Sequence, residues 1–318
     1  MIDHPRDMVL PVDKPSGPTS HDIVDLARRE IGTRRVGHTG TLDPFASGLL
    51  LLCVGRATRV AEYLTALDKT YQATMRLGRT TDTLDREGRV VREREGWAAL
   101  GPEEIVAALE RLTGEIDQVP PQYSAKKVDG EAMHRRARRG ERVELESRRV
   151  TVHELALAAL ELPLLGVRVR CSSGTYVRSL ARDVGEALGV GAHLTDLRRT
   201  AIGGFDVERA LPPEALGDRA RVAASAISPL ASLAHLPSLQ VGEEAARRLG
   251  QGQAVALADA EAGGTLPLPR GSALPVPGAA AERAPGVESP VVVACAGQIV
   301  AIAEARGGLL HPKKVFHG

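Results

Sequence analysis

The sequence predicts an α+β protein: a mixed, largely antiparallel sheet with helices, followed by a small β domain at the C-terminus. Strand-like and helix-like segments follow one another without a regular βαβ repeat, which disfavours a doubly wound fold. Segments 71–77 and 167–171 have apolar residues at every second position, as half-exposed strands do. Two apolar runs within 289–305 surround an Ala-Gly turn, which predicts a hairpin near the end of the chain.

The first elements are an extended start and a helix over 21–31. Apolar residues recur at helical spacing in this stretch, with Thr19 or Ser20 as the N-cap and Gly32 as the stop. The apolar run 49–54 lies between two glycines and suits a buried strand. The first alternating strand follows it, so the sheet begins early in the chain.

A second helix is predicted over 102–114. Pro102 stands in its first turn, acidic residues occupy the positive end of its dipole and Gly114 ends it. The later alternating strand has arginines between its apolar residues, so one of its faces is cationic. A third helix over 179–188 follows this strand and stops at Gly189.

The segment 259–290 is dense in Pro, Gly and Ala, which predicts a long and partly mobile loop. Because strand-like runs follow it, we expect the loop to interrupt a second domain. The chain thus divides into a first domain, 1–235, and a smaller β domain, 236–318. A length of 318 residues fits this arrangement.

Charge and composition narrow the functional classes. The 41 Lys and Arg residues nearly balance 40 Asp and Glu, so an affinity for nucleic acid has to come from local clusters of cations. No apolar run reaches the roughly 18 to 20 residues that span a bilayer, and the N-terminus lacks the order of a signal peptide. We therefore expect a cytoplasmic protein. Cys53, Cys171 and Cys295 have no zinc spacing and are expected to be buried thiols.

The densest group of turn-forming and polar residues is GHTGTLDPFASG, residues 37–48. Its glycines and proline restrict the backbone around a single carboxylate, that of Asp43. The segment lacks the GK[ST] of a phosphate-binding loop and the GxSxG of a nucleophile elbow. On these residues alone, an ordinary turn with a capping Asp is the favoured interpretation.

In six blocks the chain resembles the bacterial tRNA uridine-55 pseudouridine synthases, the TruB family. The blocks occur in order over about residues 8 to 210: DKPSGPTSHD, GHTGTLDPFASGLL, KTYQATMRLGRTTDTLDREG, QVPPQYSAKKVDG, SSGTYVRSLARDVGEALG and AHLTDLRRTAIGGF. The resemblance implies the pseudouridine synthase fold, with an RNA-holding cleft. It also implies isomerisation of uridine 55 in the T stem-loop of tRNA, without a cofactor.

By this resemblance Asp43, Tyr71 and Arg178 are the catalytic residues. Breaking the N1–C1′ bond and joining C1′ to C5 requires a nucleophile or a negative charge near the sugar carbon, which Asp43 supplies. Its reference pKa of about 3.9 keeps it ionised unless burial raises that value, and a nearby cation opposes the rise. Arg178 matches the arginine that pairs with the aspartate, although a phosphate-binding arginine is the alternative.

Further roles follow from the resemblance and from the need to flip the uridine out of a folded arm. Tyr71 matches the tyrosine that stacks on the target base and is a candidate to help remove the C5 proton. A core tyrosine is the alternative. Leu197 matches an apolar residue of the uracil pocket, and His38 matches the histidine that fills the space left by the flipped base. Lys14 and Pro15 match residues that buttress the active-site loop.

Residues 118–142 contain seven Lys and Arg against three Asp and Glu. The segment resembles the family insertion that folds over the RNA, and a solvated charged helix is the alternative. The side chains expected to contact RNA are Lys126, Lys127, Arg135, Arg136, Arg138 and Arg139, of which the four arginines suit phosphate groups. LLHPKKVF, residues 309–316, resembles the end of a PUA RNA-binding domain. A β module without RNA contact is the alternative there.

The acidic residues Asp82, Asp85 and Glu87 do not have calcium-loop spacing, and a flexible acidic turn is the interpretation we favour. No metal is expected. We expect a monomer with tRNA as its partner and no obligatory protein partner.

Two rival functions are a dyskerin-type synthase that needs guide RNA and partner proteins, and an RNA-binding protein without catalysis. The insertion and the lack of long Lys-rich tails disfavour the first rival. The intact Asp43, Tyr71 and Arg178 disfavour the second.

Overall fold

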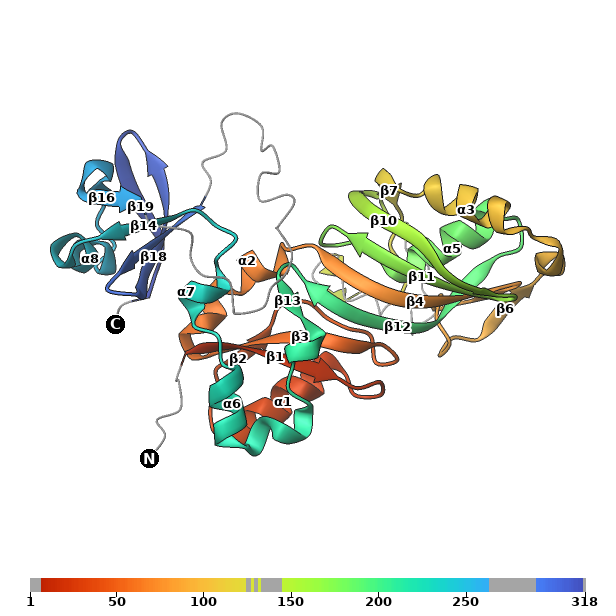
Figure 1. Cartoon of the computed structure of the whole chain (residues 1–318), viewed down its shortest axis with the longest axis horizontal. Helices are drawn as coiled ribbons and strands as arrows, with labels where there is room; N and C mark the ends of the chain where they lie inside the picture. The colour runs from red at the N-terminus through yellow and green to blue at the C-terminus, as the bar shows by residue number, and fades with distance from the viewer. Residues whose placement is uncertain (1–6, 124–126, 129–130, 133–144, 263–289, 317–318) are drawn as a thin grey trace.

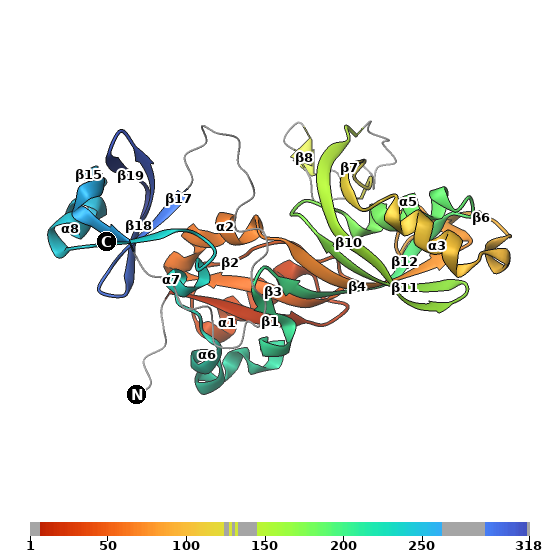
Figure 2. The same cartoon turned by 45° about the horizontal axis from the view of Figure 1, so that its top comes forward.

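The computed structural model describes residues 7–123, 127–128, 131–132, 145–262 and 290–316. Two large sheets form its frame, one of nine and one of six strands (Figure 1). Both views place the six-stranded sheet at one end of an elongated molecule, and α3 and α5 at the other end (Figure 2). The α+β class expected from the sequence is confirmed.

The nine-stranded sheet has the order β1-β3-β12-β4-β11-β10-β7, with β2 beside β3 and β13 beside β12. Its strands are β1 (Met8–Lys14), β2 (Val36–His38), β3 (Ser47–Val54), β4 (Lys69–Leu77), β7 (Gly114–Gln118), β10 (Arg148–Glu161), β11 (Leu164–Cys171), β12 (Ala192–Ile202) and β13 (Phe205–Asp206). All pairs are antiparallel except β12 with β3, where Arg198 lies opposite Ser47 and Arg199 opposite Gly48. The sheet is therefore mixed and largely antiparallel, as predicted.

The first helix, α1 (Ser20–Ile31), has the limits that its sequence predicts. Thr19 is the N-cap, and it forms a reciprocal capping box with Asp22. Gly32 ends the helix in the left-handed region, at φ 75°. These contacts are local, which is why the sequence placed the C-terminal end at Gly32 and narrowed the N-cap to Thr19 or Ser20, of which Thr19 is the one observed.

The other two predicted helices differ slightly from expectation. Helix α3 (Pro102–Glu110) ends before Gly114, which instead begins β7. Helix α5 (Val177–Ala187) begins two residues earlier than predicted, so Arg178 lies in its first turn. That start matters for function, since it fixes the direction of the Arg178 side chain.

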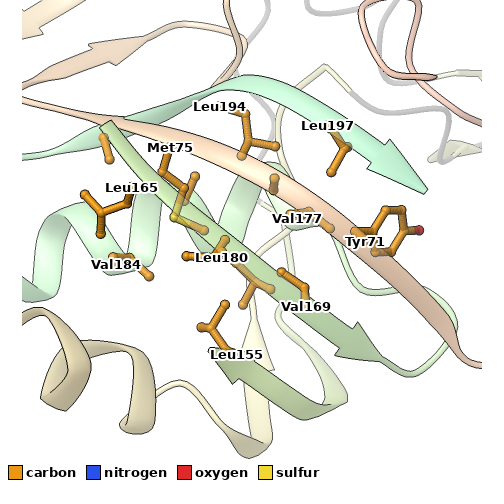
Figure 3. Packing of buried hydrophobic residues seen from close by; sticks show 14 of the residues in the cluster. Tyr71, Met75, Leu155, Leu165, Val169, Val177, Leu180, Val184, Leu194 and Leu197 are labelled. Atoms are coloured by element: carbon orange, nitrogen blue, oxygen red, sulfur yellow. The ribbon is translucent and has the colours of Figure 1, made fainter. Parts of the chain in front are cut away.

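The core of the first sheet continues directly into the candidate site. Apolar side chains from β4, β11, β12, α3 and α5 form one buried cluster (Figure 3). The cluster includes Met75, Val169 and Leu180, and also Tyr71 and Leu197. Each fully buried side chain of this size stabilises the fold by about 1.5–3 kcal/mol. Tyr71 and Leu197 are therefore held in place by the core while they face the candidate site.

The C-terminal sheet has the order β15-β19-β18-β17-β14-β16. Its strands are β14 (Ser238–Val241), β15 (Val255–Ala256), β16 (Ala260–Ala262), β17 (Pro290–Cys295), β18 (Gln298–Arg306) and β19 (Leu309–Val315). Helix α8 (Glu243–Gly250) packs against it. The predicted Ala-Gly turn is confirmed, since Ala296 and Gly297 have φ of 49° and 75° between β17 and β18.

Side chains of the two sheets share one buried cluster. Leu51 of β3 and Ile302 of β18 belong to it, together with Phe316 near the end of the chain. Lys314 adds an ion pair of 2.7 Å with Glu62 of α2 (Ala61–Thr65). The sheets are separate, but their cores are joined, and the domain boundary after residue 235 therefore stays our proposal.

Two predicted segments lie largely outside the described residues. The loop predicted at 259–290 is shorter at both ends, because residues 260–262 form β16 and Pro290 begins β17. Its remaining residues, 263–289, lie outside the described part of the chain. In the basic insertion, β8 (Lys127–Val128) pairs with β9 (Glu131–Ala132). None of the helices in the described part of the chain is both long and apolar enough to cross a membrane.

Candidate active site

The loop that carries Asp43 leads from β2 to β3 and is held by buried polar groups. Lys14 is fully buried, and its Nζ donates to the carbonyls of Pro15, Pro18 and Pro44 at 2.8, 2.8 and 3.3 Å. Burial lowers the pKa of Lys14 to about 8, although the charge of Asp43 acts in the opposite direction. Lys14 therefore ties the turn after β1 to the loop, and Pro15 takes part through its carbonyl.

A second set of hydrogen bonds joins the Asp43 loop to α1. Ser20 Oγ accepts a hydrogen bond from Leu42 N at 2.8 Å and donates to Leu42 O at 3.1 Å. Because both backbone groups of Leu42 are fixed, the position of the next residue is fixed as well. The chain thus presents Asp43 from a rigid loop and not from a mobile one.

Arg178 contacts Asp43 through two nitrogen atoms. Its Nε lies 3.0 Å from Asp43 Oδ2, and its Nη2 lies 3.1 Å from Asp43 Oδ1. A guanidinium that meets both carboxylate oxygens restricts the orientation of the carboxylate as well as its position. Arg178 is only 6% exposed, so this pair is weakly screened by solvent.

Asp85 is the second carboxylate on Arg178, at 3.2 Å from Nη1. It is 4% exposed, and its Oδ1 accepts from Thr83 Oγ1 at 2.6 Å and Glu87 N at 3.0 Å. The interpretation of this segment as a flexible acidic turn is therefore wrong for Asp85. Its place in one of the matching blocks was a signal, but residue spacing does not show which carboxylate of a turn points inward.

The ionisation of Asp43 reflects opposing effects. Burial is the largest and raises its pKa above the usual value, while the charge of Arg178 lowers it. The neighbouring charge of Asp85 adds to the rise. About a third of the Asp43 side chain is still accessible, from the side of a cavity.

That cavity has a volume of about 480 Å³. Its walls come from segments far apart in the sequence: 40–43, 172–178, Tyr71 of β4 and Leu197 of β12. Figure 3 shows the last two on adjacent strands. Burial raises the pKa of Tyr71, so its phenol is neutral at neutral pH.

Sequence analysis missed two buried cations in the cavity wall. Arg199 is 2% exposed and donates through Nε to Leu49 O at 2.7 Å and through Nη2 to Gly40 O at 3.1 Å. Lys69 is 6% exposed and donates to Thr65 O at 2.5 Å and Leu67 O at 2.7 Å. Both residues lie in the matching blocks, but only strand pairing shows that they face the cavity.

The remaining predicted residues are not gathered at the cavity. His38 is half-buried at the end of β2, where its Nδ1 accepts from Gly40 N of the following loop at 3.2 Å. Burial and then the charge of Arg199 lower the pKa of His38. The side chains of Lys126, Lys127, Arg135, Arg136, Arg138 and Arg139 lie outside the described part of the structure. Among the side chains that are described, no three His, Cys, Asp or Glu residues come together as a metal site.

Two family models match the chain. The model "TruB family pseudouridylate synthase (N terminal domain)" matches residues 28–177, and "tRNA pseudouridylate synthase B C-terminal domain" matches 178–233. The first match includes Asp43 and Tyr71, and the second begins at Arg178. The chain belongs to the TruB family. Five of the six blocks lie within the matched ranges, and the first, at residues 13–22, precedes them.

Members of the TruB family resemble this chain over nearly its whole length. A protein of Azoarcus sp. (strain BH72) named tRNA pseudouridine synthase B is 41% identical over 98% of this chain and 95% of its own. The protein of the same name from Thermobifida fusca (strain YX) is 45% identical over 98% and 99%. Both alignments therefore include the C-terminal sheet, which lies beyond the matched family models.

Solved structures support the fold. In the crystal structure of a Cbf5-Nop10-Gar1 complex, one chain is 25% identical, with a TM-score of 0.73 over 98% of this chain and 85% of that one. A chain of an archaeal box H/ACA sRNP Nop10-Cbf5 complex has a TM-score of 0.70, 24% identity and coverage of 98% and 86%. The TruB-family chain therefore has the pseudouridine synthase fold.

Proposed function

We propose that this TruB-family chain converts uridine 55 in the T arm of tRNA to pseudouridine, without a cofactor and with Asp43 as its catalytic carboxylate. The observation that carries the proposal is the two-pronged contact of Arg178 with Asp43 at the edge of a cavity. Tyr71 and Leu197 line the same cavity. The relatives named tRNA pseudouridine synthase B support tRNA as the substrate.

The reaction requires a flipped nucleotide, because a stacked uridine cannot present C1′ and C5 to one carboxylate. Once flipped, the uracil ring lies against Tyr71 and Leu197, and C1′ lies near Asp43. The carboxylate stabilises the electron-poor sugar carbon when the N1–C1′ bond breaks. The ring then presents C5 to C1′, the new bond forms and the C5 proton leaves.

Tyr71 acts in this proposal mainly as a surface for the base. Because burial raises its pKa, the phenol keeps its proton at neutral pH and is a weak base. Its ring belongs to the buried cluster behind the cavity, so it is held firmly enough to stack on a uracil. This geometry favours stacking over removal of the C5 proton.

The RNA contacts away from the cavity complete the proposal. His38 fills the space left by the flipped base, and Lys14 and Pro15 hold the loop on which Asp43 lies. The basic residues of 118–142 contact phosphate groups, which position RNA without reading its sequence. The C-terminal sheet acts as a PUA-like RNA-binding domain. We propose that the chain does all this in the cytoplasm, as a monomer without a protein partner.

A guide-dependent synthase is the second candidate, and the likeness to the chain in the Cbf5-Nop10-Gar1 complex favours it. Such a chain would be inactive without its partners. The two candidates therefore differ in what the purified protein does alone.

The test uses tRNA transcripts that carry tritium at C5 of uracil. We expect the purified protein alone to release tritium, and a transcript with cytidine at position 55 to abolish the release from that site. Asp43→Asn should bind the transcript with wild-type affinity and release none, because the amide keeps the shape and loses the charge. No release by wild-type protein, or full release by Asp43→Asn, would contradict the proposal.

A further inference from the structure

Lys69 and Arg199 form a pair of buried cations in the wall of the cavity. They lie on the neighbouring strands β4 and β12, where Arg199 is opposite Tyr71 and Lys69 is opposite Ile202. Arg199 acts on Tyr71 through its charge and a side-chain hydrogen bond, and its charge also acts on Lys69, which lies two residues before Tyr71 on the same buried face of β4. The pair therefore lies beside the surface on which the uracil stacks in the proposed function.

Neither of these two cations forms an ion pair with a carboxylate in the described part of the chain, and both are bound to backbone carbonyls. Asp68 raises the pKa of Lys69 only weakly, and it already pairs with His153 at 3.1 Å and Arg170 at 3.6 Å. Arg178, by contrast, contacts two carboxylates.

A buried charge without a counter-ion is costly. Burial and the charge of Arg199 lower the pKa of Lys69 to about 8, so the fold opposes its protonation. At neutral pH Lys69 nevertheless keeps most of its charge, because its lowered pKa of about 8 still lies above the pH. Lys69 and Arg199 thus add two buried positive charges to those of Arg148 and Arg178 in a cavity whose described lining contains one carboxylate, Asp43, and that carboxylate is already paired with Arg178.

The proposed reaction produces an anion in this cavity. When the N1–C1′ bond breaks, its electron pair leaves with N1, and the negative charge spreads over N1, O2 and O4 of the ring. The sugar carbon that loses the pair is stabilised by Asp43. C1′ then bonds to C5, the C5 proton is lost and N1 takes up a proton, so the nucleotide is isomerised with no change in atoms or charge. Positive charge placed beforehand beside the ring lowers the barrier to the first step.

We infer that Lys69 and Arg199 are catalytic residues that stabilise the uracil anion while it is detached from the sugar. This inference rests on the proposed function. The charged residues of the cavity then stabilise opposite charges on the substrate. Asp43, oriented by Arg178, stabilises the cationic sugar carbon, and Lys69 and Arg199 stabilise the anionic base.

The test compares two leaving groups in Arg199→Met. Single-turnover loss of the target nucleotide is measured, by nuclease digestion and chromatography, with uridine and with 5-fluorouridine at the target position. Fluorine at C5 withdraws electrons and stabilises the ring anion. The fluorinated base therefore depends less on stabilisation of its negative charge by the protein. With uridine we expect a rate loss on the order of 100- to 1000-fold, the usual effect of removing one preorganised charge-stabilising donor. With 5-fluorouridine the loss should be at least about tenfold smaller.

Three further variants sharpen the comparison. Arg199→Lys keeps the charge and should retain more of the uridine rate than Arg199→Met. Lys69→Met should show the same dependence on fluorine, which gives a second test should Arg199→Met fail to fold. Arg168→Met is the matched control. Arg168 lies on β11 of the same sheet, 57% exposed, and pairs with Glu154, so this variant should have wild-type rates on both substrates.

Equal losses on the two nucleotides in Arg199→Met and Lys69→Met would overturn the inference, because a purely structural role does not depend on the leaving group. A loss of RNA affinity with a normal single-turnover rate would also overturn it and would indicate a phosphate contact. An inactive wild-type protein on uridine RNA would instead overturn the proposed function as a whole.

Discussion

At the scale of single residues, Arg178 is shared by two carboxylates. Its Nε and Nη2 contact Asp43, and its Nη1 contacts Asp85. Backbone carbonyls of Thr83 and Tyr123 accept from Nη1 and Nη2 at 3.0 and 2.9 Å. The guanidinium therefore has little freedom, and the carboxylate that it holds has little freedom either.

Arg178→Lys should be seriously impaired although it keeps the charge. An ammonium is a compact charge on a flexible stem and cannot meet both oxygens of Asp43 as a planar fork does. A displacement of about 1 Å can reduce a rate on the order of a hundredfold. We expect that loss in single-turnover pseudouridine formation, with tRNA affinity nearly unchanged.

Arg182→Lys is the control, since Arg182 lies one turn further along α5 and pairs with Asp183. A normal single-turnover rate in Arg178→Lys, or an equal loss in the control, would remove Arg178 from the catalytic set.

Asp85→Asn should lower the rate and move the pH profile in a defined direction. Because a hydrogen bond to a charged group contributes about 1.5–3 kcal/mol, a roughly tenfold to hundredfold loss is expected once Arg178 is less well anchored. The charge of Asp85 raises the pKa of Asp43, so its removal lowers that pKa. The ionised Asp43 then persists to lower pH. The acid limb of the single-turnover profile should therefore shift to lower pH than in wild-type protein.

Asp82→Asn is the matched control for this variant. Asp82 belongs to the same turn but bonds Arg89 and not Arg178. An acid limb that stays in place in Asp85→Asn, or moves to higher pH, would contradict the electrostatic account of Asp43.

At the scale of elements, the contact between β3 and β12 brings the two halves of the site together. Gly48 has φ of 106°, and a Cβ built there would lie 2.2 Å from the carbonyl oxygen of Arg199. Only glycine allows both the backbone angle and this approach. The parallel pairing of the strands, on which the position of the Arg199 side chain depends, therefore requires Gly48.

Gly48→Ala should destabilise the protein more than Gly17→Ala does. Gly17 has a similar φ of 114° but open space around its Cβ position. Both variants carry backbone strain of about 1–3 kcal/mol. The first also carries overpacking of about 1–3 kcal/mol. Urea denaturation measures the difference, and equal free energies of unfolding would show that β12 moves away at no cost.

At the scale of the whole molecule, the shared apolar cluster couples the C-terminal sheet to the catalytic sheet. Arg56 Nη1 donates to Phe316 O at 2.7 Å, and Lys314 lies 5.5 Å from the centre of the Tyr63 ring. These contacts fall on the segment that leads into Lys69. The C-terminal sheet thus contacts the segment that directly precedes Thr65 and Lys69, two residues of the cavity lining.

Ile302→Ala should lower the free energy of unfolding by about 2–5 kcal/mol, as truncation of a buried Ile does. Trp97, the only tryptophan of the chain, packs against the buried cluster of the nine-stranded sheet, which does not contain Ile302. If the joined cores unfold together, this variant should lower the urea midpoint measured by Trp97 fluorescence. The midpoint measured by far-ultraviolet circular dichroism should fall by the same amount. An unshifted Trp97 transition would show that the two sheets unfold independently.

The sequence by itself determined several elements of this protein and the family to which it belongs. The capping box of Thr19, the turn at Gly297 and the alternation in β4 depend on neighbouring residues, so local patterns were sufficient to predict them. The matching blocks led to the catalytic assignment of Asp43, which is still a proposal.

Only the tertiary structure decided which side chains meet. Asp85 and Arg178 are 93 residues apart, and Arg199 and Gly40 are 159 residues apart. No local pattern determines such contacts, because each depends on strand pairing and on the burial that forces a polar side chain to find a partner. For the same reason, the charge of Lys69 and Arg199 could be read from the sequence, but their common position beside Tyr71 could not.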